Sequence, residues 1–234
     1  MRIAVLNPKS EFSNELQAKL NNLGDITYTE SRREYPIEEL TKLVNGAEIL
    51  AVDPDNLGGF EKAKEPLTKV MEALPNLKGL ALSTTAYGWI DLGYCKKRKI
   101  PVSNVPGYSL ESVAEHALAL MLNLAKRIMV TDRKTREGRY QLEMGFELKG
   151  KTLGIIGLGN IGSRMAELAQ GIGMKVISYN RSPRNKPGVE MVTLPELLRQ
   201  ADAISLHVTD SDEAKNMINN DSLSLSDEKR SDYC

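Results

Sequence analysis

Short apolar runs alternate with longer amphipathic segments along the first 99 residues of the chain. The runs have the length of buried strands, and the segments between them place apolar residues at helical spacing. The predicted strands are Ile3–Leu6, Ile26–Thr29, Glu48–Val52 and Gly79–Leu82. The predicted helices are Glu11–Asn21, Ile37–Val44, Phe60–Leu74 and Ile90–Lys97. This alternation is typical of a parallel sheet covered on both faces.

Residues 1–99 are therefore predicted to form one small open α/β domain of the flavodoxin-like type. The next segment, Ile100–Tyr108, carries two prolines and a glycine, which favours a hinge. A long helix is expected to follow, with Ser109 as its N-cap. The apolar residues that give this helix one wide face are Leu118, Met121, Leu122 and Ala125.

A glycine-rich turn follows the next apolar run, Leu153–Ile156. Gly157, Gly159 and Gly162 have the spacing G-x-G-x-x-G and lead into a helical segment, Ser163–Gln170. A strand, a glycine turn and a helix in this order form the phosphate-binding corner of a dinucleotide fold. The first glycine permits the tight turn, the second lets the backbone approach a pyrophosphate, and the third lets helix and strand pack closely.

Two more apolar runs, Lys175–Tyr179 and Ala203–Val208, supply the neighbouring strands that such a corner needs. Residues 100–210 are therefore predicted to form a Rossmann-type domain that binds a dinucleotide. An ordinary strand-to-helix turn is the alternative for the glycines taken alone. The residues predicted to hold the pyrophosphate are Gly157, Leu158, Gly159, Asn160, Ile161 and Gly162.

The character of the sequence changes from Ser211 onward. The last stretch, Asn219–Cys234, is rich in serine and aspartate and contains two leucines. Such a segment cannot bury enough apolar surface to offset the entropy lost on ordering. Residues 211–234 are therefore expected to be an aberrant, disordered tail.

Charge and cysteine content exclude several classes of function. The chain has 31 basic and 31 acidic residues and a formal net charge of zero, so no global field attracts nucleic acid or an anionic membrane. Its longest apolar stretch, Val113–Ala125, is too short and too polar to span a bilayer. Cys95 and Cys234 show no metal or redox spacing, so we expect no metal site and a cytoplasmic location.

Three segments follow one another along the chain: Asn104–Ser109 leading into Val113–His116, Leu153–Gly162, and Ala203–Val208. In this order they resemble the D-2-hydroxyacid dehydrogenase family, which includes phosphoglycerate dehydrogenase and hydroxypyruvate reductases. The resemblance covers roughly residues 1–218 and implies an NAD(P)-dependent oxidoreductase that transfers a hydride between its cofactor and a small 2-keto or 2-hydroxy acid. It also implies a substrate-binding domain first, a cofactor domain second, and a homodimer formed through the cofactor domain.

The resemblance assigns the substrate carboxylate to the loop that begins at Ser83. Paired backbone N–H groups at a strand end form an anion-binding nest, so Thr84, Thr85 and Ala86 are expected to contact the substrate. The family often has glycine at the positions of Thr84 and Ala86, and a plain turn is the alternative.

The choice of cofactor depends on the residues after the run that ends at Tyr179. Asn180 stands where NAD-using members of the family have aspartate, and Arg181, Ser182 and Arg184 follow it. Without a carboxylate to repel a phosphate, and with two guanidinium groups nearby, this pattern favours NADP(H) over NAD(H). A solvated basic loop is the alternative. We expect Asn180, Arg181 and Ser182 at the adenosine ribose or its phosphate, and His207, Val208 and Thr209 on the adenine side.

The resemblance also implies that the family's catalytic arginine, glutamate and histidine follow the position of Ile218. Because the sequence departs from the family there, no catalytic residue is assigned, and the domains at residues 1–99 and 100–210 are both expected to be incomplete. A truncated, poorly active form is expected. Of the two histidines, His207 is expected to border the cofactor and His116 to pack on the long helix. Two alternatives to an enzyme stay open. One is a non-catalytic nucleotide-binding module, and the other is a fragment that pairs with a fuller subunit through the helix Ser109–Met129.

Overall fold

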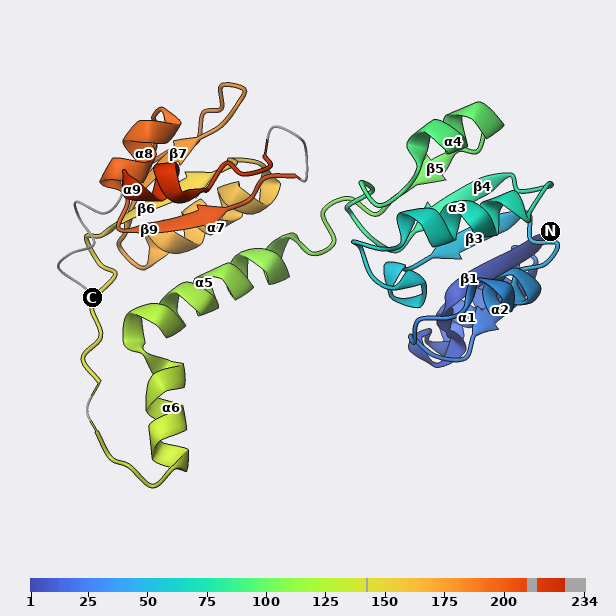
Figure 1. The fold of residues 1–234 in the computed structure, drawn as a ribbon, viewed down its shortest axis with the longest axis horizontal. Helices are drawn as coiled ribbons and strands as arrows, with labels where there is room; N and C mark the ends of the chain where they lie inside the picture. The colour runs from blue at the N-terminus through green and yellow to red at the C-terminus, as the bar shows by residue number, and fades with distance from the viewer. Residues whose placement is uncertain (142, 210–213, 226–234) are drawn as a thin grey trace. The chain divides into compact units, whose positions relative to one another are not determined.

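The chain forms two compact units, each with its own sheet and its own core (Figure 1). The computed structural model describes residues 1–141, 143–209 and 214–225. The units are Met1–Tyr108 and Ser109–Cys234, and each is described by itself.

Five parallel strands form the sheet of the first unit, in the order β2-β1-β3-β4-β5. This order is that of flavodoxin-like folds, which confirms the fold predicted for this part of the chain. The strands are β1 (Arg2–Pro8), β2 (Asp25–Thr29), β3 (Ile49–Val52), β4 (Gly79–Leu82) and β5 (Val102–Ser103). The helices are α1 (Asn14–Asn21), α2 (Ile37–Leu43), α3 (Lys64–Glu72) and α4 (Leu92–Arg98), with short 3-10 helices η1 (Lys9–Glu11) and η2 (Pro54–Leu57).

Strand β5 lies in the segment that the sequence suggested as a hinge. Val102 pairs with Leu80 of β4, and Ser103 pairs with Ala81. The prediction of a hinge was therefore wrong at these two residues. The strand was missed because two residues are too few to show an apolar alternation. Because β5 completes the first sheet, the first unit continues to Tyr108, beyond the boundary after residue 99 that the sequence suggested.

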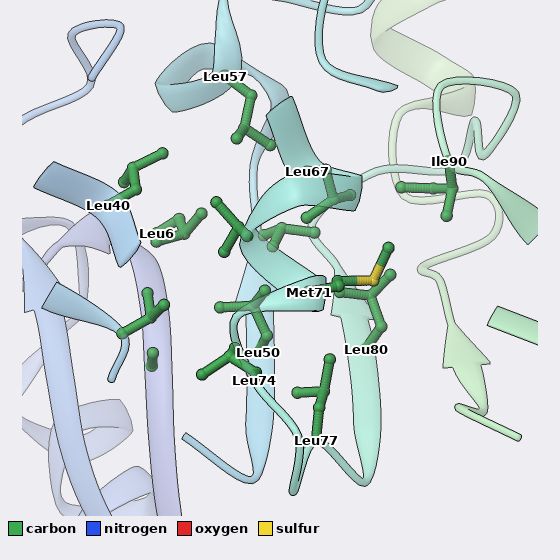
Figure 2. Close-up of a cluster of buried hydrophobic side chains, with 14 of the residues drawn as sticks. Leu6, Leu40, Leu50, Leu57, Leu67, Met71, Leu74, Leu77, Leu80 and Ile90 are labelled. Carbon is green, nitrogen blue, oxygen red and sulfur yellow. The ribbon is translucent and has the colours of Figure 1, made fainter. Parts of the chain in front are cut away.

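The core of the first unit is built around α3 (Figure 2). Leu67, Val70, Met71 and Leu74 follow one another at i, i+3, i+4 and i+7, so they line one face of the chain from α3 into the turn after it. All four are at most 1% exposed, and they pack in one cluster with apolar residues of the strands, such as Leu50. This packing gives the first unit a hydrophobic core of its own.

Four parallel strands form the sheet of the second unit, in the order β8-β7-β6-β9. These are the first four positions of the Rossmann order 3-2-1-4-5-6, which confirms a dinucleotide-type fold. The strands are β6 (Thr152–Ile156), β7 (Lys175–Tyr179), β8 (Val189–Met191) and β9 (Ala203–Leu206). The helices are α5 (Leu110–Lys126), α6 (Ile128–Arg136), α7 (Asn160–Gly171), α8 (Leu194–Gln200) and α9 (Asn220–Ser224).

Helices cover both faces of this second sheet (Figure 1). On one face, α7 lies between the sheet and α5, and Met165 and Ala166 of α7 are fully buried with Leu153 of β6. On the other face, α8 places Leu197 against Ile177 of β7. The second unit therefore has the layered arrangement expected of a parallel sheet.

The long helix expected after Tyr108 is shorter than the sequence suggested. It ends at Lys126, because Arg127 adopts a left-handed conformation (φ 54°), and α6 begins at the next residue. Ser109 stands at the N-cap position, but its side chain makes no capping hydrogen bond.

Part of the expected disordered tail is folded. Residues 214–225 are described and contain α9, and Met217 and Ile218 pack against the buried cluster of Ile156 and Ile177. The rest of the tail, residues 211–213 and 226–234, lies outside the described residues. No helix within the described part of the chain is long and apolar enough to cross a membrane.

Candidate dinucleotide-binding site

The candidate site lies at the carboxyl ends of β6 and β9, where the strand order of the second sheet reverses. After β6 the chain adds β7 and β8 on one side of β6, and then β9 on the other side. The N–H of His207 donates to the carbonyl of Ile156 at 2.8 Å, so the two strand ends lie side by side. Open α/β sheets bind ligands at the crevice that such a switch point creates.

The three glycines of the turn serve different purposes. Gly157 has φ 98°, and a Cβ there would lie 2.5 Å from the carbonyl oxygen of His207. A Cβ on Gly162 would lie 2.1 Å from the carbonyl oxygen of Gly157. Around a Cβ on Gly159 there would be no atom within 4 Å. Two of the glycines therefore permit close packing, and Gly159 leaves open space beside the backbone.

The start of α7 faces this open space with unused donors. Gly159 is the N-cap residue, and the first intrahelical bond runs from the N–H of Ser163 to the carbonyl of Gly159 at 2.8 Å. The N–H groups of Asn160, Ile161 and Gly162 precede that bond, so the helix does not use them. Together with the helix dipole, they suit an anion.

Asn180 ties the glycine turn to the end of β7. Its Oδ1 accepts a hydrogen bond from the N–H of Leu158 at 3.0 Å, and its Nδ2 donates to the carbonyl of Ser182 at 2.6 Å. The Leu158 side chain is buried in the core of this unit, so only its backbone takes part. Asn180 therefore holds both the turn and the start of the following loop.

A cleft of about 530 Å³ connects these parts, a volume within the range of ligand pockets. It brings together eight of the residues predicted from the sequence: Gly157, Gly159, Asn180, Arg181, Ser182, His207, Val208 and Thr209. The other predicted residues do not line the cleft and lie in the turn or the first turn of α7: Leu158, Asn160, Ile161 and Gly162.

Four further residues line the cleft that the predicted set leaves out: Tyr179, Arg184, Ala214 and Met217. Arg184 belongs to the basic loop that already favoured a phosphate, so its signal was present in the sequence. Met217 lies in a polar segment without periodicity, and only the packing of that segment on the second sheet brings it to the cleft.

The described lining of the cleft is neutral or positively charged. It contains the guanidinium groups of Arg181 and Arg184, and none of its described residues carries a carboxylate. Residues 210–213 lie outside the described part of the chain. A negatively charged ligand group therefore meets favourable charge beside Asn180.

His207 is arranged to stay neutral. Its Nε2 lies 2.8 Å from Oγ of Ser205, and burial lowers the pKa of the imidazole below its usual range. A neutral, hydrogen-bonded ring beside the cleft fits a role in lining the site. His116 is exposed on α5, whereas the sequence suggested a packed side chain.

The predicted substrate loop lies in the first unit, after β4. Its side chains and carbonyls are bound internally: Thr84 Oγ1 donates to the carbonyl of Ala86 at 2.8 Å, and Asn104 Nδ2 donates to the carbonyl of Thr85 at 2.8 Å. Trp89 Nε1 also donates to the carbonyl of Ala86, at 2.9 Å. The backbone N–H groups of Thr84, Thr85 and Ala86 donate to no other described residue. The loop is thus fixed by these hydrogen bonds, and Thr84 within it is buried.

A second cavity, of about 740 Å³, lies at the opposite end of the second sheet. It is lined by Thr152 and Lys175, the first residues of β6 and β7, and by Glu190 of β8. Because parallel sheets bind ligands at the carboxyl ends of their strands, we place the functional site at the other cavity.

Fold and cleft together define the second unit as a dinucleotide-binding α/β domain. Residues 118–230 match the family described as "D-isomer specific 2-hydroxyacid dehydrogenase, NAD binding domain". The chain is 34% identical to a hydroxypyruvate reductase of Thermotoga maritima over 225 residues, which covers 95% of this chain and 69% of that protein. It is 37% identical to a glyoxylate reductase of Korarchaeum cryptofilum over 165 residues, 66% of this chain and 50% of that one.

The fold has a close counterpart among solved structures. An acyclic imino acid reductase, solved in complex with NADPH and D-Arg, superposes with a TM-score of 0.79 at 29% identity and covers 96% of this chain and 71% of that one. The chain thus spans between half and about 70% of these relatives. It belongs to the D-2-hydroxyacid dehydrogenase family, whose NAD-binding domain provides a site for a nicotinamide cofactor.

Proposed function

We propose that the protein is an oxidoreductase that transfers a hydride between a nicotinamide cofactor and a small 2-keto or 2-hydroxy acid. The observation that carries the proposal is the glycine turn at the switch point, where Gly159 leaves open space in front of the first N–H groups of α7. The named activities of the relatives, reduction of glyoxylate and of hydroxypyruvate, indicate the class of substrate. The cofactor supplies the hydride, and the protein binds and orients it.

The residues of the second unit divide the work of holding the cofactor. The N–H groups of Asn160, Ile161 and Gly162 would bind the pyrophosphate, with Gly159 giving the backbone access. Leu158 would act through Asn180, to which its N–H is already bonded. His207, Val208 and Thr209 would line the adenine side, because all three lie along the cleft.

The preferred form of the cofactor is NADP(H). Asn180 brings no charge to the position where a carboxylate would repel a 2′-phosphate, and Arg181 and Arg184 line the same cleft. Arg181 and Ser182 would contact the ribose or its phosphate.

The substrate carboxylate would lie on the loop after β4 in the first unit. The support is the set of N–H groups at Thr84, Thr85 and Ala86, which no other described residue accepts from. The hydrogen bonds from the Thr84 hydroxyl to the carbonyl of Ala86 and from Asn104 to the carbonyl of Thr85 would keep these donors in place.

The polypeptide of 234 residues, produced alone, is expected to bind NADPH more tightly than NADH and to show little turnover of glyoxylate or hydroxypyruvate. Turnover needs a proton donor at the keto oxygen, and of the two histidines of the chain, one is bonded to Ser205 and one is exposed on α5. Titrations followed by cofactor fluorescence, and assays at 340 nm, measure the two properties separately.

The two results distinguish the open alternatives. Binding without turnover would favour a nucleotide-binding module, and efficient turnover would show that the chain carries its own acid–base group. A dissociation constant of about 1 mM corresponds to a binding free energy of only about −4.1 kcal/mol. If neither cofactor bound at about this concentration, the proposed function would be overturned.

A second copy of the chain is the proposed partner of the second unit. Large apolar side chains stay exposed along α5 and the start of α6, although the opposite face of α5 is packed. Leu124 is 76% exposed, and the others are Val113, Leu120, Ile128 and Met129. Apolar residues gathered in this way mark association surfaces. We also propose a cytoplasmic location, in keeping with the few cysteines of the chain.

Replacing Leu124 with glutamate is expected to convert a dimer into a monomer without unfolding the chain, because a charge would be buried at the interface and Leu124 packs little within its own chain. Sedimentation velocity over a concentration series measures the change. The control is Leu16→Glu, since Leu16 is exposed on α1 of the first unit. A monomer in the unsubstituted chain at high concentration would contradict the proposal.

A further inference from the structure

The loop that carries the cleft arginines is anchored to α7 by two side chains outside the cleft. The loop runs from Asn180 to Gly188, between β7 and β8. Lys186 Nζ lies 2.7 Å from Oε1 of Glu167, and Gln170 Nε2 donates to the carbonyl of Pro187 at 3.2 Å. Glu167 and Gln170 are three residues apart on α7, so they present one face to the loop.

The anchor is built into the loop at both of its contacts. Lys186 keeps 19% of its side chain exposed, although residues 181–185 are all exposed. Gly188 has φ 70°, a conformation that favours glycine, and a Cβ there would lie 2.6 Å from Nε2 of Gln170, so the amide packs closely against this residue. The far end of the loop is thus fitted to α7, while Asn180 holds its near end.

Glu167 is itself held in place. Its second oxygen, Oε2, lies 2.8 Å from Nη1 of Arg164, and Arg164 Nε lies 2.7 Å from Oε2 of Glu111 on α5. The two cations lower the pKa of Glu167, so the carboxylate stays charged near neutral pH. A chain of ion pairs therefore connects α5, α7 and the loop.

We propose that Glu167 and Gln170 are positioning residues for cofactor choice: by fixing the loop, they hold Arg184 and its neighbours where a 2′-phosphate of the adenosine ribose would lie. This inference rests on the proposed preference for NADP(H). An ion pair that is partly exposed, as this one is, contributes little to global stability, so we do not assign it a role in holding the fold together. Its effect is to reduce the freedom that the loop loses when a phosphate binds.

Replacing Glu167 with glutamine separates positioning from simple charge. The substitution removes a negative charge from the helix that holds the loop, so electrostatics alone would tighten binding of the doubly phosphorylated 2′,5′-ADP. Loss of the anchor would weaken it instead. The probes are 2′,5′-ADP and 5′-AMP, measured by calorimetry on the whole chain, and the readout is the ratio of their dissociation constants.

We expect E167Q to lower the preference for 2′,5′-ADP over 5′-AMP about two- to tenfold, the effect of one or two additional side chains to be ordered on binding. Gln170→Ala should lower the ratio in the same direction without any change of charge. The matched control is Asp132→Asn, which breaks the exposed pair of Asp132 with Arg136 on α6 and should leave the ratio unchanged. The rate of amide hydrogen exchange in the loop, residues 181–188, should rise in the free protein in both α7 variants, Glu167→Gln and Gln170→Ala.

The outcomes separate this inference from the function on which it rests. If the unsubstituted chain clearly prefers 2′,5′-ADP over 5′-AMP and both α7 variants keep or increase this preference, the positioning role alone would be overturned. Equal binding of the two nucleotides by the unsubstituted chain would overturn the NADP preference and, with it, the inference.

Discussion

Replacing Gly159 with alanine is expected to weaken binding of both NADPH and NADH by about tenfold or more, equivalent to about 1.4 kcal/mol, while the stability of the second unit stays unchanged. A Cβ on this residue would meet no atom of the chain within 4 Å, and its φ of −77° suits any residue. The methyl group would instead occupy the space in which the pyrophosphate approaches the backbone. Cofactor fluorescence measures the affinity, and circular dichroism during urea denaturation measures the stability.

Gly162→Ala is the informative companion, because the same methyl group there meets the chain itself. Alanine favours a helix over glycine by about 1 kcal/mol, but a Cβ 2.1 Å from the carbonyl oxygen of Gly157 forces the turn and α7 apart. Such overpacking costs about 1–3 kcal/mol, so we expect a net loss of both stability and binding. The single tryptophan, Trp89, lies in the first unit and does not report on this change.

If the two alanine variants behaved alike, the distinct roles assigned to the glycines would be wrong. Equal stability with equal loss of binding would mean that Gly162 also faces the ligand. Full binding by Gly159→Ala would mean that the pyrophosphate lies elsewhere.

Replacing Asn180 with aspartate is expected to reverse the cofactor preference. Oδ1 of the new side chain could still accept from the N–H of Leu158, as Asn180 does at 3.0 Å. Its second oxygen could no longer donate to the carbonyl of Ser182, as Nδ2 of Asn180 does, and would turn away from it. This oxygen would repel a 2′-phosphate and accept from a ribose 2′-hydroxyl instead. Like charges brought together at a binding site cost several kcal/mol, so NADPH affinity should fall by about 100-fold while NADH affinity is kept or improved. Parallel titrations with the two cofactors measure the change.

The control for this charge effect is Asn180→Ala. It removes the hydrogen bonds to Leu158 and Ser182 without adding a charge, so it should weaken both cofactors to a similar degree. An unaltered NADPH affinity in Asn180→Asp would show that no 2′-phosphate lies near this side chain.

Much of the fold followed from local sequence patterns. The strands β4 and β7 have the bounds that the apolar runs suggested, Gly79–Leu82 and Lys175–Tyr179. Runs of this length are buried on both faces of a parallel sheet, so nearly every residue carries the signal. The shortest strands were missed because the signal depends on length. Strand β5 has two residues and β8 has three, which are too few to show a pattern.

The candidate site was predicted where chemistry and spacing coincide. The glycine spacing identified the turn, and Asn180 with the arginines after it identified the end of β7. Met217 could not be found in this way, because it reaches the cleft only through the packing of a polar segment on the second sheet. Nor could Glu167 and Gln170, since an exposed helix face looks the same in sequence whether or not a loop lies against it.

By itself, the sequence determined the class of the protein. Its apolar residues recur with the periods of strands and helices, and its glycine spacing lies between a predicted strand and a predicted helix, the context in which it indicates a phosphate-binding turn. The tertiary structure decided which residues meet. It placed the carbonyl of His207 against Gly157 and formed the hydrogen bond from the N–H of Leu158 to Asn180. It also packed the loop from Asn180 to Gly188 against α7. These contacts join residues distant along the chain, so their distances depend on how the strands are ordered and packed, which no local pattern encodes.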